Sequence, residues 1–174
     1  RQVRALLVVN PKATTTSPRA REVIVHALAS AVDLDVADTL RRGHAQDLAR
    51  QARRDGVDHV LVLGGDGTVN EVVNGLLADG TGHDVPVLGA IPGGSANVFA
   101  RGVGLPDDPI EATGAVIEAI EHKRTRTIGL GTAAWDGTTR WFLCNAGLGV
   151  DAEIIEDMER QRARGHDATP ARYF

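Results

Sequence analysis

The 174-residue sequence predicts an α/β fold, in which a mostly parallel sheet with crossover helices precedes the start of an antiparallel element. Three observations lead to this prediction. Short apolar runs alternate with helix-like stretches over the first two thirds of the chain, as in a parallel sheet with crossover helices. Glycine-rich or small polar turns follow those apolar runs. The pattern then changes to two strand-like segments around Asp136-Gly137, a pair typical of an antiparallel hairpin.

Four strands are expected at residues 5–9, 34–39, 59–63 and 87–91, and Asp35 and Asp38 interrupt the apolar pattern of the second. Helices are expected at residues 18–31, 44–55, 68–77, 95–101 and 108–121. Ser17-Pro18 supplies an N-cap and a first-turn proline for the first of these helices. The third helix is the most regular, because its apolar side chains recur at helical spacing and form one stripe: Val69, Val72, Val73, Leu76 and Leu77.

After residue 121 the pattern changes, and strands are expected at residues 125–134 and 138–145. We therefore predict two domains, residues 1–123 and an incomplete, β-rich second domain at residues 124–174. A charged helix is expected at residues 151–164. Gly147-x-Gly149-x-x-Ala152 matches a dinucleotide-binding fingerprint locally, but we interpret it as a chance match because too little chain follows.

Composition excludes several classes of function. A net charge of −4 and an aromatic content of 3% give neither the basic surface nor the stacking platforms of a nucleic-acid-binding protein. The single cysteine, Cys144, cannot form an internal disulfide, and we interpret it as a core residue of a cytoplasmic protein. No apolar run approaches the ~20 residues that span a bilayer.

The loops that follow the four strands carry the unusual chemistry of the chain. They begin at Asn10, Thr39, Gly64 and Pro92. Because the carboxyl ends of parallel strands meet at one edge of a sheet, these loops are expected to converge where open α/β sheets bind ligands.

Gly64-Gly65-Asp66-Gly67-Thr68 lies between a strand and a helix, an arrangement that suits phosphate binding. The carboxylate of Asp66 cannot hold an anion directly, so it points to a cation, Mg²⁺, between it and the phosphates. An alternative needs no ligand: Thr68 and Glu71 fit a capping box, with Thr68 as the N-cap.

A second glycine turn, Pro92-Gly93-Gly94-Ser95, repeats this design. Ser95 is either a ligand contact or only the N-cap of the following helix. Asn10 could merely start a turn before Pro11, and Lys12 could be a solvated loop residue. The chain lacks the Gly-Lys-Ser/Thr of a P-loop.

Taken together, these motifs resemble the diacylglycerol kinase catalytic-domain family, and specifically its soluble bacterial lipid kinases. The resemblance rests on Asn10-Pro11, on Thr39-x-x-x-Gly43-His44-Ala45, and on the segment from Leu61 to Glu71 with Asn74-Gly75. It also rests on the stretch from Pro92 to Ala100 and on the one from Asn145 to Ala152. These motifs occur in the family's order along the whole chain.

The resemblance implies a three-layer α/β/α nucleotide-binding domain with a mostly parallel sheet, followed by the start of an antiparallel β-sandwich domain. It also implies an ATP-dependent kinase that phosphorylates a lipid hydroxyl, such as that of diacylglycerol, at the inner face of the membrane, with peripheral attachment. It leaves a homodimer open and implies Mg²⁺ as a cofactor, with Asp66 in the metal network. By motif matching, ATP would contact Asn10, Pro11, Lys12, Ala13, Thr14, Thr39, Gly65, Asp66, Gly67, Thr68, Val69, Asn70, Glu71 and Ser95.

We interpret the chain as an inactive fragment, because it lacks an initial methionine and the family's general base would lie beyond Phe174. The chain also departs from the family pattern. Ala13-Thr14 replaces a serine-glycine pair, and Val98 and Gly129 stand where aspartates are usual. Two alternatives therefore stay open: an NAD kinase, which shares the Gly-Gly-Asp-Gly core, and a non-catalytic nucleotide-binding module.

Overall fold

The computed structural model describes residues 1–12, 16–144 and 160. The chain divides into two compact units, Arg1–Leu143 and Cys144–Phe174. Nearly all described residues belong to the first unit, whose architecture follows. The predicted Gly147 to Ala152 motif lies outside the described residues, as does the predicted helix at 151–164 apart from Arg160.

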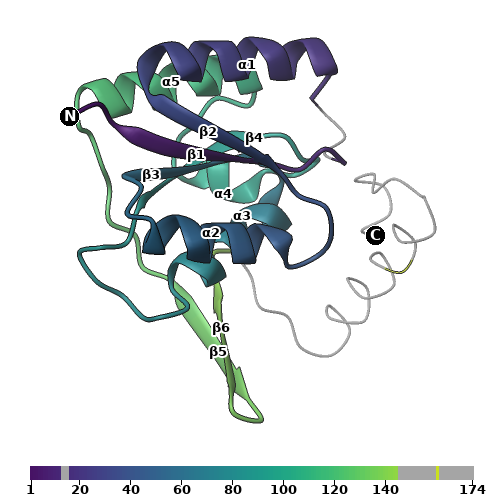
Figure 1. Ribbon diagram of the computed structural model, residues 1–174. Coiled ribbons are helices and arrows are strands. Elements are labelled where there is room, and N and C mark those ends of the chain that lie inside the picture. The colour runs from purple at the N-terminus through teal and green to yellow at the C-terminus, as the bar shows by residue number, and fades with distance from the viewer. Residues whose placement is uncertain (13–15, 145–159, 161–174) are drawn as a thin grey trace. The chain divides into compact units, whose positions relative to one another are not determined.

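A sheet of four parallel strands forms the middle layer of the first unit (Figure 1). Its strands are β1 (Arg4–Val9), β2 (Asp33–Asp38), β3 (His59–Gly64) and β4 (Val87–Pro92). Their order is β2-β1-β3-β4, and every pairing is parallel. The predicted α/β class and its parallel sheet are thereby confirmed.

Helices cover both faces of this sheet (Figure 1). The helices α1 (Pro18–Ala31) and α5 (Pro109–Glu121) pack together on one face, and α2 (His44–Arg54) and α3 (Asp66–Leu76) pack together on the other. Strand β3 shows how the two cores form. Val60 and Val62 point into the α2–α3 core, whereas Leu61 and Leu63 point into the α1–α5 core, since strand side chains alternate.

Small residues let α2 and α3 approach closely. The buried face of α2 consists of alanines, Ala45, Ala49 and Ala52. On α3, Gly75 faces the backbone carbonyl of Gln46 and the methyl group of Ala49, and a Cβ at Gly75 would overlap both. The absence of a side chain at Gly75 therefore sets the distance between the two helices.

Two helix starts differ from the sequence-based predictions by two residues or more. The helix α3 begins at Asp66 with Gly65 as its N-cap, so the capping box with Thr68 as the N-cap is wrong. The short helix α4 (Val98–Gly102) begins three residues later than predicted, with Asn97 and not Ser95 at its N-cap. Gly65 has no side chain to cap α3, and the side chain of Asn97 makes no capping hydrogen bond to α4.

The predicted hairpin is present as β5 (Gly131–Trp135) and β6 (Thr138–Phe142). Asp136 and Gly137 both have positive φ, 45° and 74°, as a tight two-residue turn between antiparallel strands requires. The predicted strand at 125–134 is shorter than expected, since residues 125–130 are not in a strand.

Within the described part of the chain, no helix has the length and apolarity needed to cross a membrane.

We predict that Gly75→Ala destabilises the first unit by about 1–3 kcal/mol, the usual cost of forcing extra volume into a packed interior. Gly114→Ala is the matched control, because Gly114 lies on the exposed side of α5 and a Cβ there meets no atom within 4 Å. Since alanine favours a helix over glycine, this control should be neutral or stabilising by up to about 1 kcal/mol. Urea denaturation measures both, and equal effects would contradict the proposed role of Gly75.

Candidate functional site

The strand order of the sheet changes direction at β1, so the carboxyl ends of β1 and β3 form its topological switch point. From β1 the chain crosses to β2 on one side, and it returns to β3 on the other side of β1. The loops that leave β1 and β3 therefore diverge, as they do at the ligand-binding switch points of open α/β sheets. Asn10 and Gly65 lie at the start of these two loops.

The two glycine turns pack backbone against backbone. The amide of Gly93 donates to the carbonyl of Gly64 at 2.9 Å. A Cβ at Gly94 would lie 2.5 Å from the Cα of Gly65, and a Cβ at Gly93 would lie 3.0 Å from the amide nitrogen of Gly64. These glycines are therefore needed for the close approach of the turns, whether or not a ligand is present.

Asp66 joins the same two turns through its side chain. One carboxylate oxygen accepts the amide of Val98 at 3.0 Å, and the other accepts the amide of Phe99 at 2.9 Å. Asp66 therefore caps the start of α4, which satisfies two of the amides that a helix leaves unpaired. The sequence did not predict this role, because a cap from 32 residues away leaves no local spacing signal.

Gly67 differs from the other glycines of the first turn. It is exposed, and a Cβ built there would meet no atom within 4 Å. It is the second residue of α3, where a helix has no carbonyl four residues earlier to pair the amide; the next amide, that of Thr68, donates to the carbonyl of Gly65 at 3.1 Å. The backbone near Gly67 can therefore be approached by a ligand, and helix starts favour anionic ones.

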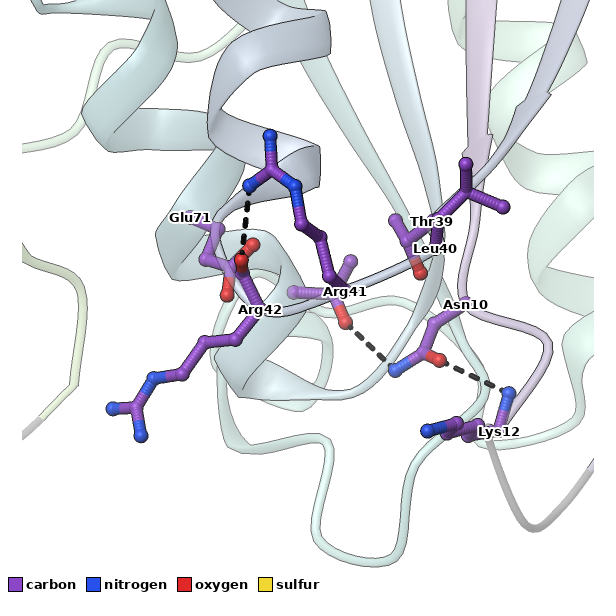
Figure 2. Close-up of a pocket in the computed structure, with 8 residues that line it drawn as sticks. Asn10, Lys12, Thr39, Leu40, Arg41, Arg42 and Glu71 are labelled. Carbon is purple, nitrogen blue, oxygen red and sulfur yellow. Dashed lines mark hydrogen bonds between the residues drawn. The ribbon is translucent and has the colours of Figure 1, made fainter.

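A polar pocket of about 180 Å³ opens beside the start of α3 (Figure 2). Its walls come from the loops after β1 and β2 and from α3: Asn10, Lys12, Thr39, Leu40, Arg41, Arg42, Thr68 and Glu71. Asn10 ties two of these walls together. Its amide nitrogen donates to the hydroxyl of Thr68 at 3.2 Å, and its carbonyl oxygen accepts the amide of Lys12 at 3.0 Å.

Glu71 holds the third wall in place. Its Oε1 accepts the amide of Gly43 at 3.0 Å, at the N-terminus of α2. This bond fixes the loop between β2 and α2, which carries Arg41 and Arg42. The Nη2 of Arg41 pairs with the carboxylate of Asp47 at 2.7 Å, and both side chains are largely exposed.

The sequence did not predict that Arg41 and Arg42 line the pocket. The sequence did place both arginines in a loop at the edge of the sheet where a ligand was expected, and this could have indicated their position at the pocket. Five predicted residues, Asn10, Lys12, Thr39, Thr68 and Glu71, do line this pocket.

Other predicted residues lie elsewhere. The side chain of Val69 is buried in the α2–α3 core, and Ser95 is exposed outside the pocket. Pro11 is exposed, and Asn70 is half-buried with its Oδ1 unpaired. Ala13 and Thr14 lie outside the described residues.

A larger groove of about 600 Å³ runs along β4 and is lined mainly by aliphatic side chains. Phe99 of α4 contributes to its wall, as do residues 124–128. None of the predicted site residues line this groove, so the polar pocket is the stronger candidate for binding an anion.

The comparisons with known proteins agree on one family. A model of the diacylglycerol kinase catalytic domain matches residues 4–133. A probable YegS-like lipid kinase from Chromohalobacter salexigens is 38% identical over 148 residues, which cover 85% of this chain and 44% of that protein. The lipid kinase YegS of Escherichia coli strain K12 is 40% identical over 103 residues, 59% of this chain and 34% of that protein.

Solved structures give the same result. A putative diacylglycerol kinase from Bacillus anthracis strain Sterne matches with a TM-score of 0.61 and 36% identity, over 68% of this chain and 43% of that one. A second structure from the same organism matches with a TM-score of 0.58 and 34% identity, over 67% and 42%. The chain thus spans less than half the length of these relatives.

We predict that Gly94→Ala lowers the melting temperature, because the added Cβ would push against the Cα of Gly65 and separate the two turns. Overpacking of this kind costs about 1–3 kcal/mol. Gly67→Ala, only two residues after Gly65, should leave the melting temperature unchanged or raise it, since its Cβ meets no atom within 4 Å. Calorimetry of the two variants tests this, and a stable Gly94→Ala variant would contradict the backbone packing.

Proposed function

The chain belongs to the diacylglycerol kinase catalytic-domain family, and we propose that it is the ATP-binding part of an ATP-dependent lipid kinase. The reaction transfers the γ-phosphoryl group of ATP to the hydroxyl of a lipid such as diacylglycerol. The names of the relatives support an enzyme that acts on lipid. Because the chain covers less than half of those relatives, the activity is proposed for the whole protein.

The pocket beside the start of α3 is the observation that carries this proposal. Catalysis of phosphoryl transfer is mostly positioning and charge neutralisation, so a kinase needs cations and amides around the phosphates. Lys12 and Arg41 supply cations at the pocket, and the start of α3 supplies amides. At about 180 Å³ the pocket is smaller than the roughly 300–1,000 Å³ of whole small-molecule sites. We therefore assign it to the phosphates, with the rest of the nucleotide outside it.

Mg²⁺ is proposed to arrive with ATP. Among the described residues, no group of three or more His, Cys, Asp and Glu side chains could hold a metal ion. Asp66 is nevertheless compatible with one, because each of its oxygens accepts a single amide and keeps a second lone pair. Protein sites for Mg²⁺ often consist of one or two carboxylates, substrate phosphates and water. The ion would neutralise charge on the phosphates.

The acceptor side of the reaction is proposed to lie in the rest of the protein. The general base would come from residues beyond Phe174. The lipid would be presented at a membrane surface, to which the protein attaches peripherally on the cytoplasmic side. A second copy of the chain in a homodimer is compatible with this arrangement.

The whole protein should transfer ³²P from γ-labelled ATP to at least one lipid of a panel that includes diacylglycerol, a ceramide and a sphingoid base. The assay contains Mg²⁺ and detergent-mixed micelles, and a parallel reaction contains NAD in place of lipid. Transfer to NAD alone would replace the proposal with an NAD kinase. ATP binding without transfer to any acceptor would indicate a non-catalytic module.

Gly67→Ala links this activity to the start of α3. The added methyl group occupies the open space over the first turn, so ATP affinity should fall about tenfold while stability is retained. Gly114→Ala on α5 serves as the control, with unchanged ATP affinity. Unchanged ATP affinity in Gly67→Ala would place the phosphates elsewhere.

Arg41 and Asp47 should have opposite effects on ATP binding. Arg41→Gln removes a cation from the pocket wall and should weaken ATP binding, whereas Asp47→Asn releases Arg41 and should tighten it about twofold to fivefold. Both effects should shrink at high ionic strength, because the groups are exposed. Titration calorimetry at low and high salt measures them, and weaker binding in Asp47→Asn would contradict the competition.

A further inference from the structure

Asn74 joins α3 to the β5–β6 hairpin, because both its amide nitrogen and its carbonyl oxygen form hydrogen bonds. The residue is only 8% exposed. Its amide nitrogen donates to the carbonyl of Trp141 at 2.9 Å, and its carbonyl oxygen accepts the amide of Trp141 at 2.9 Å. The same amide nitrogen also donates to the carbonyl of Asn70, one turn earlier on α3, at 2.8 Å.

The side chain of Asn74 makes the two hydrogen bonds to Trp141 that a neighbouring strand would otherwise make. Trp141 is opposite Thr132 in the β5–β6 pair, and alternate residues of such a pair direct their N–H and C=O groups away from the partner strand. Asn74 supplies both the donor and the acceptor that these outward groups need. An isolated two-stranded hairpin is marginally stable in water, so this contact matters for its position.

The same helix reaches the phosphate-binding end of the site. Gly67 and Asn74 are seven residues apart on α3, which is two turns or roughly 10 Å along the helix axis. The helix is fixed between them, because Glu71 bonds to Gly43 and Thr68 accepts from Asn10. The hairpin is therefore held at a set distance from the start of α3.

We propose that Asn74 is a positioning residue for the reaction, which fixes the β5–β6 hairpin relative to the phosphate-binding end of α3. This inference rests on the proposed function. Phosphoryl transfer requires the acceptor oxygen close to the γ-phosphorus, and an error of about 1 Å can cost a hundredfold in rate. Asn74 thus acts on the reaction through Trp141 and makes no contact with ATP or lipid.

The test compares Asn74→Ala with Thr113→Val in the whole protein. Thr113 is buried in α5, on the opposite face of the sheet, and its hydroxyl donates to the carbonyl of Pro109 at 2.6 Å. Thr113→Val therefore also removes a buried hydrogen bond, but one far from α3. Asn74→Ser, whose hydroxyl can still donate to the carbonyl of Asn70 but is too short to bond to Trp141, is the second variant should Asn74→Ala not fold.

Three measurements are made on each variant: ATP affinity, kcat for ³²P transfer to phosphatidylcholine vesicles that contain diacylglycerol, and hydrogen exchange at the Trp141 amide. In Asn74→Ala, ATP affinity should stay within about twofold, kcat should fall about tenfold or more, and the Trp141 amide should exchange faster. Thr113→Val should change none of these. Asn74→Ser should lower kcat and Trp141 protection in the same direction as Asn74→Ala.

Equal kcat in Asn74→Ala and Thr113→Val would overturn the inference, and so would a parallel loss of ATP affinity in Asn74→Ala. If the wild-type protein binds ATP but transfers no phosphate to any lipid, the proposed function fails instead. The exchange measurement then decides the inference by itself, because unchanged exchange at Trp141 in Asn74→Ala contradicts the anchoring.

Discussion

The close approach of the two glycine turns is the constraint on which the rest of the site depends. Gly64 and Gly65 after β3 lie directly against Gly93 and Gly94 after β4, with a backbone hydrogen bond between them. This contact sets where α3 can begin, and Asp66 at its first residue then reaches across to cap α4. A side chain at Gly93 or Gly94 would move both helix starts together. The fold therefore requires these glycines even when no ligand is bound.

The helix α3 connects most of the functional features, although it is only 11 residues long. Its first turn faces the proposed phosphates, its middle holds the β2–α2 loop through Glu71, and its last turns hold the hairpin through Asn74. Close packing against α2 at Gly75 keeps the helix from shifting. Because the interior of a protein is packed like a crystal, a displacement at one end of such a helix is felt at the other.

The sequence predicted the elements well and their contacts poorly, for a physical reason. Strands and amphipathic helices follow from local periodicity, so the parallel sheet and the edge where its loops meet could be predicted from the sequence. The capping box failed because Gly65 starts the helix earlier, which leaves Thr68 and Glu71 to bond with distant loops. Arg41 and Asn74 were missed for the same reason: their roles depend on residues that only the fold brings near.

The charged groups on and around α3 fall into two sets with different roles in the proposed kinase. The helix carries two carboxylates, Asp66 and Glu71, and both already accept backbone amides that hold loops in place. Under the proposed function, each carboxylate holds in place a loop near the phosphates. Neither is then needed as a proton acceptor, because the general base is proposed to lie elsewhere. Cations and amides remain to face the donor phosphates. The described residues are therefore suited to holding the donor, which agrees with the proposal that another part of the protein activates the acceptor.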